Sequence, residues 1–247
     1  DAVVSRGLGD VYKRQVVPWP DRHFPVELTV GKASGIPDRR IARGRHRTGP
    51  MGSVTSDIQD PGKSPGDRQL IRAGRLFTGG GAAPLADRMI EITDGVVTGI
   101  APAGEAGGQA DAHFDSVAPG FIDLQINGAG GALFNDAPNE ATLRTMISAA
   151  RKGGTCHMLP TFITAAGDAY RQAMAAVAAF PGPEVLGLHL EGPFLSPDKP
   201  GIHPKDAIRT IADDDIGALV SHRGLILLTL APEHVTAEQM ALLRKAG

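Results

Sequence analysis

Residues 188–203, LHLEGPFLSPDKPGIH, are the stretch from which the fold of this chain can be inferred. The stretch begins with apolar residues that suit a buried strand. That strand must stop at Gly192-Pro193, because proline has no amide hydrogen and glycine permits a sharp turn. Glu191 is therefore predicted at the carboxyl end of a strand. In a barrel of alternating strands and helices, this end of the strands forms the face that carries the chemistry.

The alternation of strands and helices continues on both sides of this stretch. Asn139 and Thr236 are in position to cap two of the predicted helices. Four strand–helix units in succession predict a parallel sheet with right-handed crossovers, and so an α/β protein. Four is half of eight, so if the fold is a (β/α)8 barrel, residues 118–247 form its first half. Its first and fourth strands would then be unpaired edges. The predicted strands are 120–126, 155–162, 185–190 and 225–230, and the predicted helices are 140–152, 167–180, 212–222 and 237–246.

The residues before the barrel fall into three parts. Residues 70–117 contain short strands at 70–77, 88–92 and 96–100 with glycine-containing turns between them, which predicts a partial β-sandwich. Residues 51–69 are rich in Ser, Asp, Pro and Gly and are predicted to be a flexible tail. Residues 1–50 show no period, and we interpret them as a non-native or disordered leader.

Composition and charge exclude several classes of protein. With 42% hydrophobic and 21% charged residues, the chain is globular and has no apolar run long enough to span a membrane. The single cysteine, Cys156, excludes an internal disulfide framework and favours a reducing compartment, and no secretory signal is recognisable. We therefore predict a cytoplasmic location. Residues 1–50 hold ten Lys and Arg against five Asp and Glu, so a basic arm that binds nucleic acid is an alternative for this part.

Three motifs occur together in this sequence. They are HLEGPF with the Lys-Pro-Gly-Ile-His loop that ends at His203, PGFIDLQING at 119–128, and Leu159-Pro160-Thr161 with Thr164 beyond it. In this order they resemble the N-acetylglucosamine-6-phosphate deacetylases of the amidohydrolase superfamily, over roughly residues 70–247. The resemblance implies hydrolysis of the acetamide of N-acetylglucosamine 6-phosphate to glucosamine 6-phosphate and acetate. It also implies one divalent metal ion, with zinc the expected ion.

The resemblance also implies roles for individual residues. Glu191 matches the metal ligand of the family, His203 and the backbone of Ile202 would contact the substrate, and Gln125 and Asn127 would support the site by hydrogen bonding. Many amidohydrolases carry two histidines where Gln125 and Asn127 stand, and amides are weaker ligands than imidazole, so a second tightly held metal is not expected. Without the resemblance, Glu191 would more simply cap or salt-bridge its loop, and His203 would be a solvated loop histidine.

Other groups that the family uses have no counterpart in this sequence. They are two further histidine ligands on later strands and an aspartate that serves as general acid and base. We therefore expect a fragment of a longer enzyme that is inactive by itself, and assign no catalytic residue within it. The expected partner is a small-molecule amino-sugar phosphate rather than a nucleic acid or a membrane, with homodimerisation of the full-length protein left open. The alternatives are an amidohydrolase acting on a cyclic amide or a related amino-sugar phosphate, and a non-enzymatic domain with a basic arm.

Overall fold

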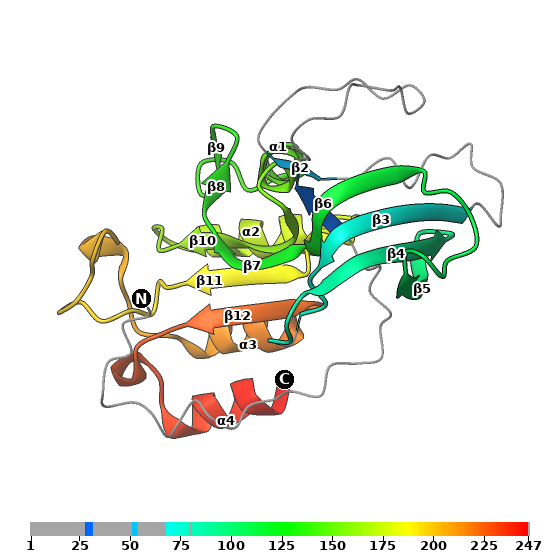
Figure 1. The fold of residues 1–247 in the computed structure, drawn as a ribbon. Helices are drawn as coiled ribbons and strands as arrows, with labels where there is room; N and C mark the ends of the chain where they lie inside the picture. The colour runs from blue at the N-terminus through cyan, green and yellow to red at the C-terminus, as the bar shows by residue number, and fades with distance from the viewer. Residues whose placement is uncertain (1–27, 32–50, 54–67, 80, 247) are drawn as a thin grey trace.

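The computed structural model describes residues 28–31, 51–53, 68–79 and 81–246. A six-stranded mixed sheet lies beside a four-stranded parallel sheet whose strands alternate with helices (Figure 1). The two sheets are joined through Gly120 alone, because one strand ends at Pro119 and the next begins at Phe121. The predicted α/β class is confirmed.

The six-stranded sheet has the order β2-β1-β6-β3-β4-β5. The antiparallel pairs β3–β4 and β4–β5 follow the predicted strands and turn, whereas β6 was not predicted and pairs in parallel with β3. The side chains of Ile71, Ile90 and Val117 form its small core. The strands are β1 (Leu28–Gly31), β2 (Met51–Ser53), β3 (Arg68–Leu76), β4 (Leu85–Thr93), β5 (Val96–Pro102) and β6 (Ala112–Pro119).

The predicted leader and tail fall mostly outside the described residues. Within residues 1–69 the structure places the short strands β1 and β2, of which β1 pairs antiparallel with β6, and the first two residues of β3, Arg68 and Gln69. The predictions of a non-native leader at 1–50, of a basic arm there, and of a flexible tail at 51–69 therefore stay predictions.

The parallel sheet has the order β12-β11-β10-β7, with every neighbouring pair parallel. A short hairpin that was not predicted, β8 (Gly128–Ala129) with β9 (Ala132–Leu133), follows β7. The strands are β7 (Phe121–Ile126), β10 (Thr155–Ile163), β11 (Gly187–Glu191) and β12 (Leu225–Thr229), and the helices are α1 (Glu140–Arg151), α2 (Ala169–Ala179), α3 (Asp213–Ser221) and α4 (Ala237–Ala246).

Both predicted helix caps are confirmed. Asn139 accepts a hydrogen bond from the amide of Thr142 at 3.0 Å, at the start of α1. Thr236 and Gln239 exchange two bonds at the start of α4, with the Thr236 hydroxyl accepting from the Gln239 amide at 3.1 Å and the Gln239 side chain accepting from the Thr236 amide at 3.0 Å. These bonds satisfy amide groups that have no partner within the helix, and so fix where each helix begins.

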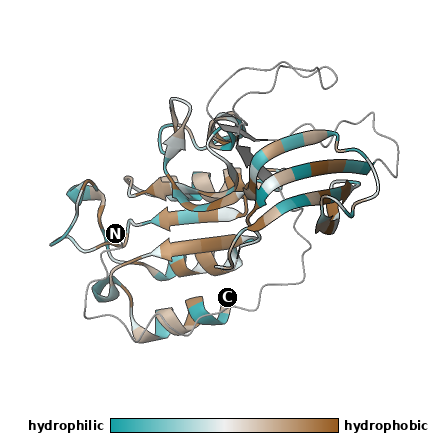
Figure 2. Ribbon diagram, in the orientation of Figure 1, coloured by the Kyte–Doolittle hydropathy of each residue, from teal (hydrophilic) through white to brown (hydrophobic). Residues whose placement is uncertain are grey.

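The main core lies between the parallel sheet and its helices. Fully buried members include Leu143 on α1, Leu188 and Leu190 on β11, and Phe194 just after β11. Figure 2 shows apolar residues running along the strands of this sheet. No helix among the described residues is long and apolar enough to cross a membrane.

The two outer strands of the parallel sheet leave apolar side chains uncovered. On β7, Phe121, Ile122 and Leu124 are each more than half exposed, and on β12 Leu227 is 40% exposed. Within the described part of the chain, β7 and β12 each have a single neighbour in this sheet. The prediction that the first and fourth strands form open edges is confirmed.

Candidate functional site

Glu191 is the last residue of β11, at the carboxyl edge of the parallel sheet. One of its carboxylate oxygens, Oε2, accepts a hydrogen bond from the side-chain amide of Gln125 on β7 at 3.0 Å. Gly192 then turns the chain with a φ of +90°, and a Cβ at this position would clash with the hydroxyl of Thr164. The turn that the sequence predicted therefore holds the Glu191 carboxylate at the mouth of the sheet, with about a quarter of its side chain exposed.

His203 returns to Glu191 although it lies twelve residues further along the chain. Its Nε2 is 3.9 Å from Oε1 of Glu191, and its Nδ1 is 2.9 Å from the hydroxyl oxygen of Thr164. The imidazole is largely buried, with a side-chain exposure of 9%. His203 is thus a packed and hydrogen-bonded member of the site and not a solvated loop residue.

The loop that carries His203 is attached to the body of the molecule at both ends. The carbonyl of Phe194 accepts a hydrogen bond from the amide of Ala231 at 2.7 Å, and the carbonyl of Pro193 accepts one from the amide of Arg209 at 3.0 Å. The guanidinium of Arg209 also stacks over the ring of Phe194, 5.1 Å from its centroid. These contacts fix the ends of the loop and so help to keep His203 next to Glu191.

A layer of polar side chains lies beneath the Glu191 carboxylate. His189 of β11 is buried, and its two ring nitrogens meet Thr161 on β10 at 3.3 Å and Thr229 on β12 at 2.9 Å. Burial lowers the pKa of His189, whereas the neighbouring Glu191 carboxylate acts to raise it. His189 is thus a packed core residue whose ring links β10, β11 and β12.

Asn127 and Ile202 stand apart from this group. The strand β7 ends at Ile126, so Asn127 lies outside the strand whose alternation would place its side chain on the same face as that of Gln125. The carbonyl of Asn127 accepts a hydrogen bond from the amide of Phe134 at 2.9 Å. Ile202 is 86% exposed at the tip of the loop. Their predicted contributions, side-chain support from Asn127 and a backbone contact from Ile202, stay predictions.

The donor atoms of the site are too few to hold a metal ion. Catalytic zinc needs three protein ligands and an open position. In the part of the chain that the structure describes, no three His, Cys, Asp or Glu residues are grouped so that they could hold one. Glu191 offers one anionic oxygen, Oε1, that Gln125 does not occupy. The described residues therefore do not form a complete metal site by themselves.

Two supporting residues were not given their role by the sequence. Asn135 makes two hydrogen bonds of 2.9 Å, to the amide and to the carbonyl of Ile163, and so fixes the end of β10. The hydroxyl of Thr164 contacts both the ring of His203 and the carbonyl of Glu191. The LPT motif with Thr164 beyond it signals polar residues near a strand end without showing their partners.

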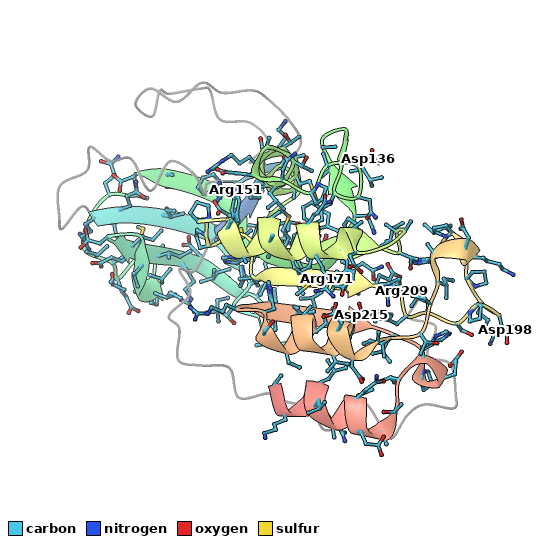
Figure 3. The ribbon with its side chains drawn as sticks, turned by 180° about the vertical axis from the view of Figure 1, so that it is seen from behind. Asp136, Arg151, Arg171, Asp198, Arg209 and Asp215 are labelled. Carbon is cyan, nitrogen blue, oxygen red and sulfur yellow. The ribbon has the colours of Figure 1, made fainter. Side chains whose placement is uncertain are left out.

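A buried ionic group between α2 and α3 also escaped prediction (Figure 3). Arg209 donates to both carboxylate oxygens of Asp215 at 2.5 and 2.8 Å, and Tyr170 and the amide of Ala212 donate at 2.7 and 2.8 Å. Burial alone would raise the pKa of Asp215, but these donors lower it to about 2. Asp215 is one of three consecutive aspartates in the first turn of α3, a pattern that does not show which of them is buried or what it contacts.

Comparison with known proteins identifies related chains. A model of the amidohydrolase family matches residues 116–246. The chain is 40% identical over 171 residues to an N-acetylgalactosamine-6-phosphate deacetylase of Shewanella sp. (strain ANA-3), covering 64% of this chain and 42% of that protein. It is 36% identical over 141 residues to the N-acetylglucosamine-6-phosphate deacetylase of Haemophilus influenzae, covering 56% of this chain and 37% of that protein. The chain thus spans less than half the length of these relatives.

Solved structures of two deacetylases share the fold of this chain. The N-acetylglucosamine-6-phosphate deacetylase of Pasteurella multocida superposes with a TM-score of 0.63 at 28% identity, covering 72% of this chain and 49% of that one. The N-acetyl-D-glucosamine-6-phosphate deacetylase of Mycobacterium smegmatis superposes with a TM-score of 0.64 at 26% identity, covering 72% and 48%.

Proposed function

The chain belongs to the amidohydrolase family, and we propose that the protein containing it removes the acetyl group from N-acetylglucosamine 6-phosphate. The products are glucosamine 6-phosphate and acetate. The observation that supports this most is that Glu191 on β11, Gln125 on β7 and His203 on a loop meet at the carboxyl edge of a parallel sheet. In barrels of this class the carboxyl edge is where substrates bind.

The role that we propose for each residue in the site follows from its contacts. The Gln125 amide donates to one oxygen of Glu191 and so orients the carboxylate with its other oxygen facing the site. His203 forms a wall beside that oxygen, and we place the sugar against His203 and the backbone of Ile202. Asn127 is proposed to support the site next to the hairpin that follows β7.

We propose that Glu191 supplies one ligand to a divalent metal ion, with zinc as the expected ion. Amidohydrolases are typically metal-dependent, and a metal ion in such enzymes polarises a carbonyl and activates water. Because the described residues supply a single anionic ligand, the other ligands and the general acid and base are assigned to residues outside the described ones.

N-Acetylgalactosamine 6-phosphate is a second candidate substrate. The relative with 40% identity is a deacetylase of that sugar phosphate, and the relative with 36% identity is a deacetylase of the glucosamine compound. The two sugars differ only in the orientation of one hydroxyl group. We propose the glucosamine compound first because the motifs around Glu191 and His203 resemble those of its deacetylases.

The test is to measure acetate release by the complete protein from each of the two sugar phosphates. A ratio of kcat/KM above one in favour of N-acetylglucosamine 6-phosphate supports the first assignment, and the reverse ratio supports the second. In the same assay, Glu191→Gln should lower kcat/KM by more than about 100-fold, because loss of a group that only orients a metal ligand already costs 10- to 100-fold.

Glu105→Gln is the matched control, since Glu105 is an exposed glutamate in the turn after β5, in the six-stranded sheet. It should leave the rate within twofold of the wild type. A Glu191→Gln protein with wild-type activity and metal content would refute the assignment.

A further inference from the structure

Arg209 attaches the base of the loop after β11, residues 193–209, to the helices packed on the parallel sheet. The backbone amide of Arg209 donates to the carbonyl of Pro193 at 3.0 Å and so closes the base of the loop. Its guanidinium lies over the ring of Phe194 and donates to both carboxylate oxygens of Asp215. One residue therefore joins the two ends of the loop to each other and to the first turn of α3.

The carboxylate that receives Arg209 is itself fixed from two helices. Asp215 is buried and accepts further hydrogen bonds from the hydroxyl of Tyr170 on α2 and from the amide of Ala212 before α3. Figure 3 shows Arg209 and Asp215 on the helical side of the sheet. A guanidinium that donates to both oxygens of a carboxylate is held in orientation as well as in distance. The base of loop 193–209 is thus attached to a fixed point.

Between its ends the loop is folded upon itself. Successive backbone hydrogen bonds close turns from Lys199 to Ser196 at 3.2 Å, from His203 to Pro200 at 3.0 Å and from Ala207 to Pro204 at 3.0 Å. Ile202 and His203 lie in the second of these turns. Because each turn restricts the backbone, a displacement at the base is carried to Ile202 and His203. The ring of His203 reaches the hydroxyl of Thr164 at 2.9 Å only while this part of the loop lies over the edge of the sheet.

We propose that Arg209 is a positioning residue that keeps Ile202 and His203 over the site by holding the base of their loop. The inference rests on the proposed function, in which these two residues contact the sugar phosphate. Arg209 acts through the loop and not through contact with the substrate. A displaced loop weakens a substrate contact, and the loss of one hydrogen bond corresponds to about a tenfold loss of affinity.

Arg171 on α2 provides a matched control, because it belongs to the same ionic group. Its side chain is 33% exposed, as is that of Arg209. Its guanidinium lies over the ring of Tyr170, 5.6 Å from the centroid, and pairs with Asp214 at 2.6 Å. Among the described residues, its ring and ion-pair partners lie on or next to α2 and α3 and not on the loop.

The experiment compares the complete wild-type protein with Arg209→Lys and Arg171→Lys. Lysine keeps the positive charge beside Asp215, so both variants should fold, but it has no planar group that can stack or donate as a fork. KM and kcat are measured with whichever of the two sugar phosphates the wild type hydrolyses faster. Hydrogen–deuterium exchange, followed by mass spectrometry of peptides from residues 193–209, reports opening of the loop without any need for turnover. Urea unfolding gives the global stability of each variant.

A second perturbation tests the same attachment from the side of the loop. Phe194→Leu removes the ring on which the guanidinium stacks and leaves the pair between Arg209 and Asp215 in place. It carries the test if Arg209→Lys does not fold.

We expect Arg209→Lys to raise KM about tenfold, with kcat changed less than threefold, and to speed exchange of the loop amides about tenfold. Phe194→Leu should change both quantities in the same direction. Arg171→Lys should leave KM and loop exchange within twofold of the wild type, even where its global stability falls as much as that of Arg209→Lys.

Three results would overturn the proposal. They are a KM within twofold of the wild type in Arg209→Lys, an equal rise of KM in Arg171→Lys, and a raised KM without faster exchange of the loop. A wild type that is inactive on both sugar phosphates would count against the proposed function instead. Loop exchange in the two lysine variants would still decide whether Arg209 holds the loop.

Discussion

Asp215 offers a stringent test of the packing behind the site. Its carboxylate is 2% exposed and is bonded to Arg209, Tyr170 and the amide of Ala212. Asp215→Asn removes the negative charge but keeps the shape. Removing one partner of a buried ion pair costs about 3–5 kcal/mol, because the other charge stays buried without compensation. Arg209 is only partly buried, so we expect a loss at the lower end, about 3 kcal/mol in the free energy of unfolding at pH 7.

The same group predicts how stability depends on pH. The fall in the pKa of Asp215 from 3.8 to about 2 corresponds to about 2 kcal/mol of stabilisation by the ionised form. Because the pKa is lower in the folded state, this stabilisation is fully present above about pH 4 and is lost as the pH falls through 2. The stability difference between wild type and Asp215→Asn should therefore shrink between pH 4 and pH 2.

Urea unfolding followed by circular dichroism at a series of pH values measures both effects. Asp214→Asn is the matched control: it lies in the same helical turn and pairs with Arg171, but its side chain is 87% exposed. An exposed pair contributes at most about 1 kcal/mol, so this variant should unfold close to the wild type. The reasoning is wrong if Asp215→Asn is as stable as Asp214→Asn, or if its difference from wild type does not change with pH.

Two further predictions concern the turn after β11 and the start of α1. Gly192→Ala should destabilise the protein by about 1–3 kcal/mol and reduce the deacetylation proposed above, because the new Cβ meets the Thr164 hydroxyl at a positive φ. Gly217→Ala in α3, where nothing lies near the added Cβ, should be neutral or stabilising in the same urea titration. Asn139→Ala should lower the unfolding free energy by about 1 kcal/mol through loss of the cap on the Thr142 amide, and a change below 0.3 kcal/mol would show that this bond contributes little.

The barrel elements could be predicted because their signals are local. The helix at 140–152 and its cap at Asn139 follow from spacing and a single side chain, and the structure has α1 at Glu140–Arg151. The stop after Glu191 follows from Gly192 and Pro193, and β11 ends there. Each of these signals acts within a few residues, so no knowledge of the tertiary structure was needed.

Contacts between distant residues could not be predicted in this way. Strand β6, AHFDSVAP, carries only two large apolar residues, and its parallel pairing with β3 depends on residues about forty positions away. Thr164 meets His203 across 39 residues, and Tyr170 meets Asp215 across 45. The nature of each residue indicated a polar role, but its partner is set by the packing of the strands and loops between them.

The single residue between the two sheets has a consequence for engineering the protein. Gly120 is the entire connection from β6 to β7, and Gln125 lies only five residues beyond it. A connection of one residue allows little relative motion, so the orientation of the mixed sheet and that of the first barrel strand are coupled. A chimera that exchanges the amino-terminal sheet for that of another enzyme would shift the amide beside Glu191 unless its joint preserved this geometry. Recombination points are better chosen in the longer segment between the β8–β9 hairpin and α1.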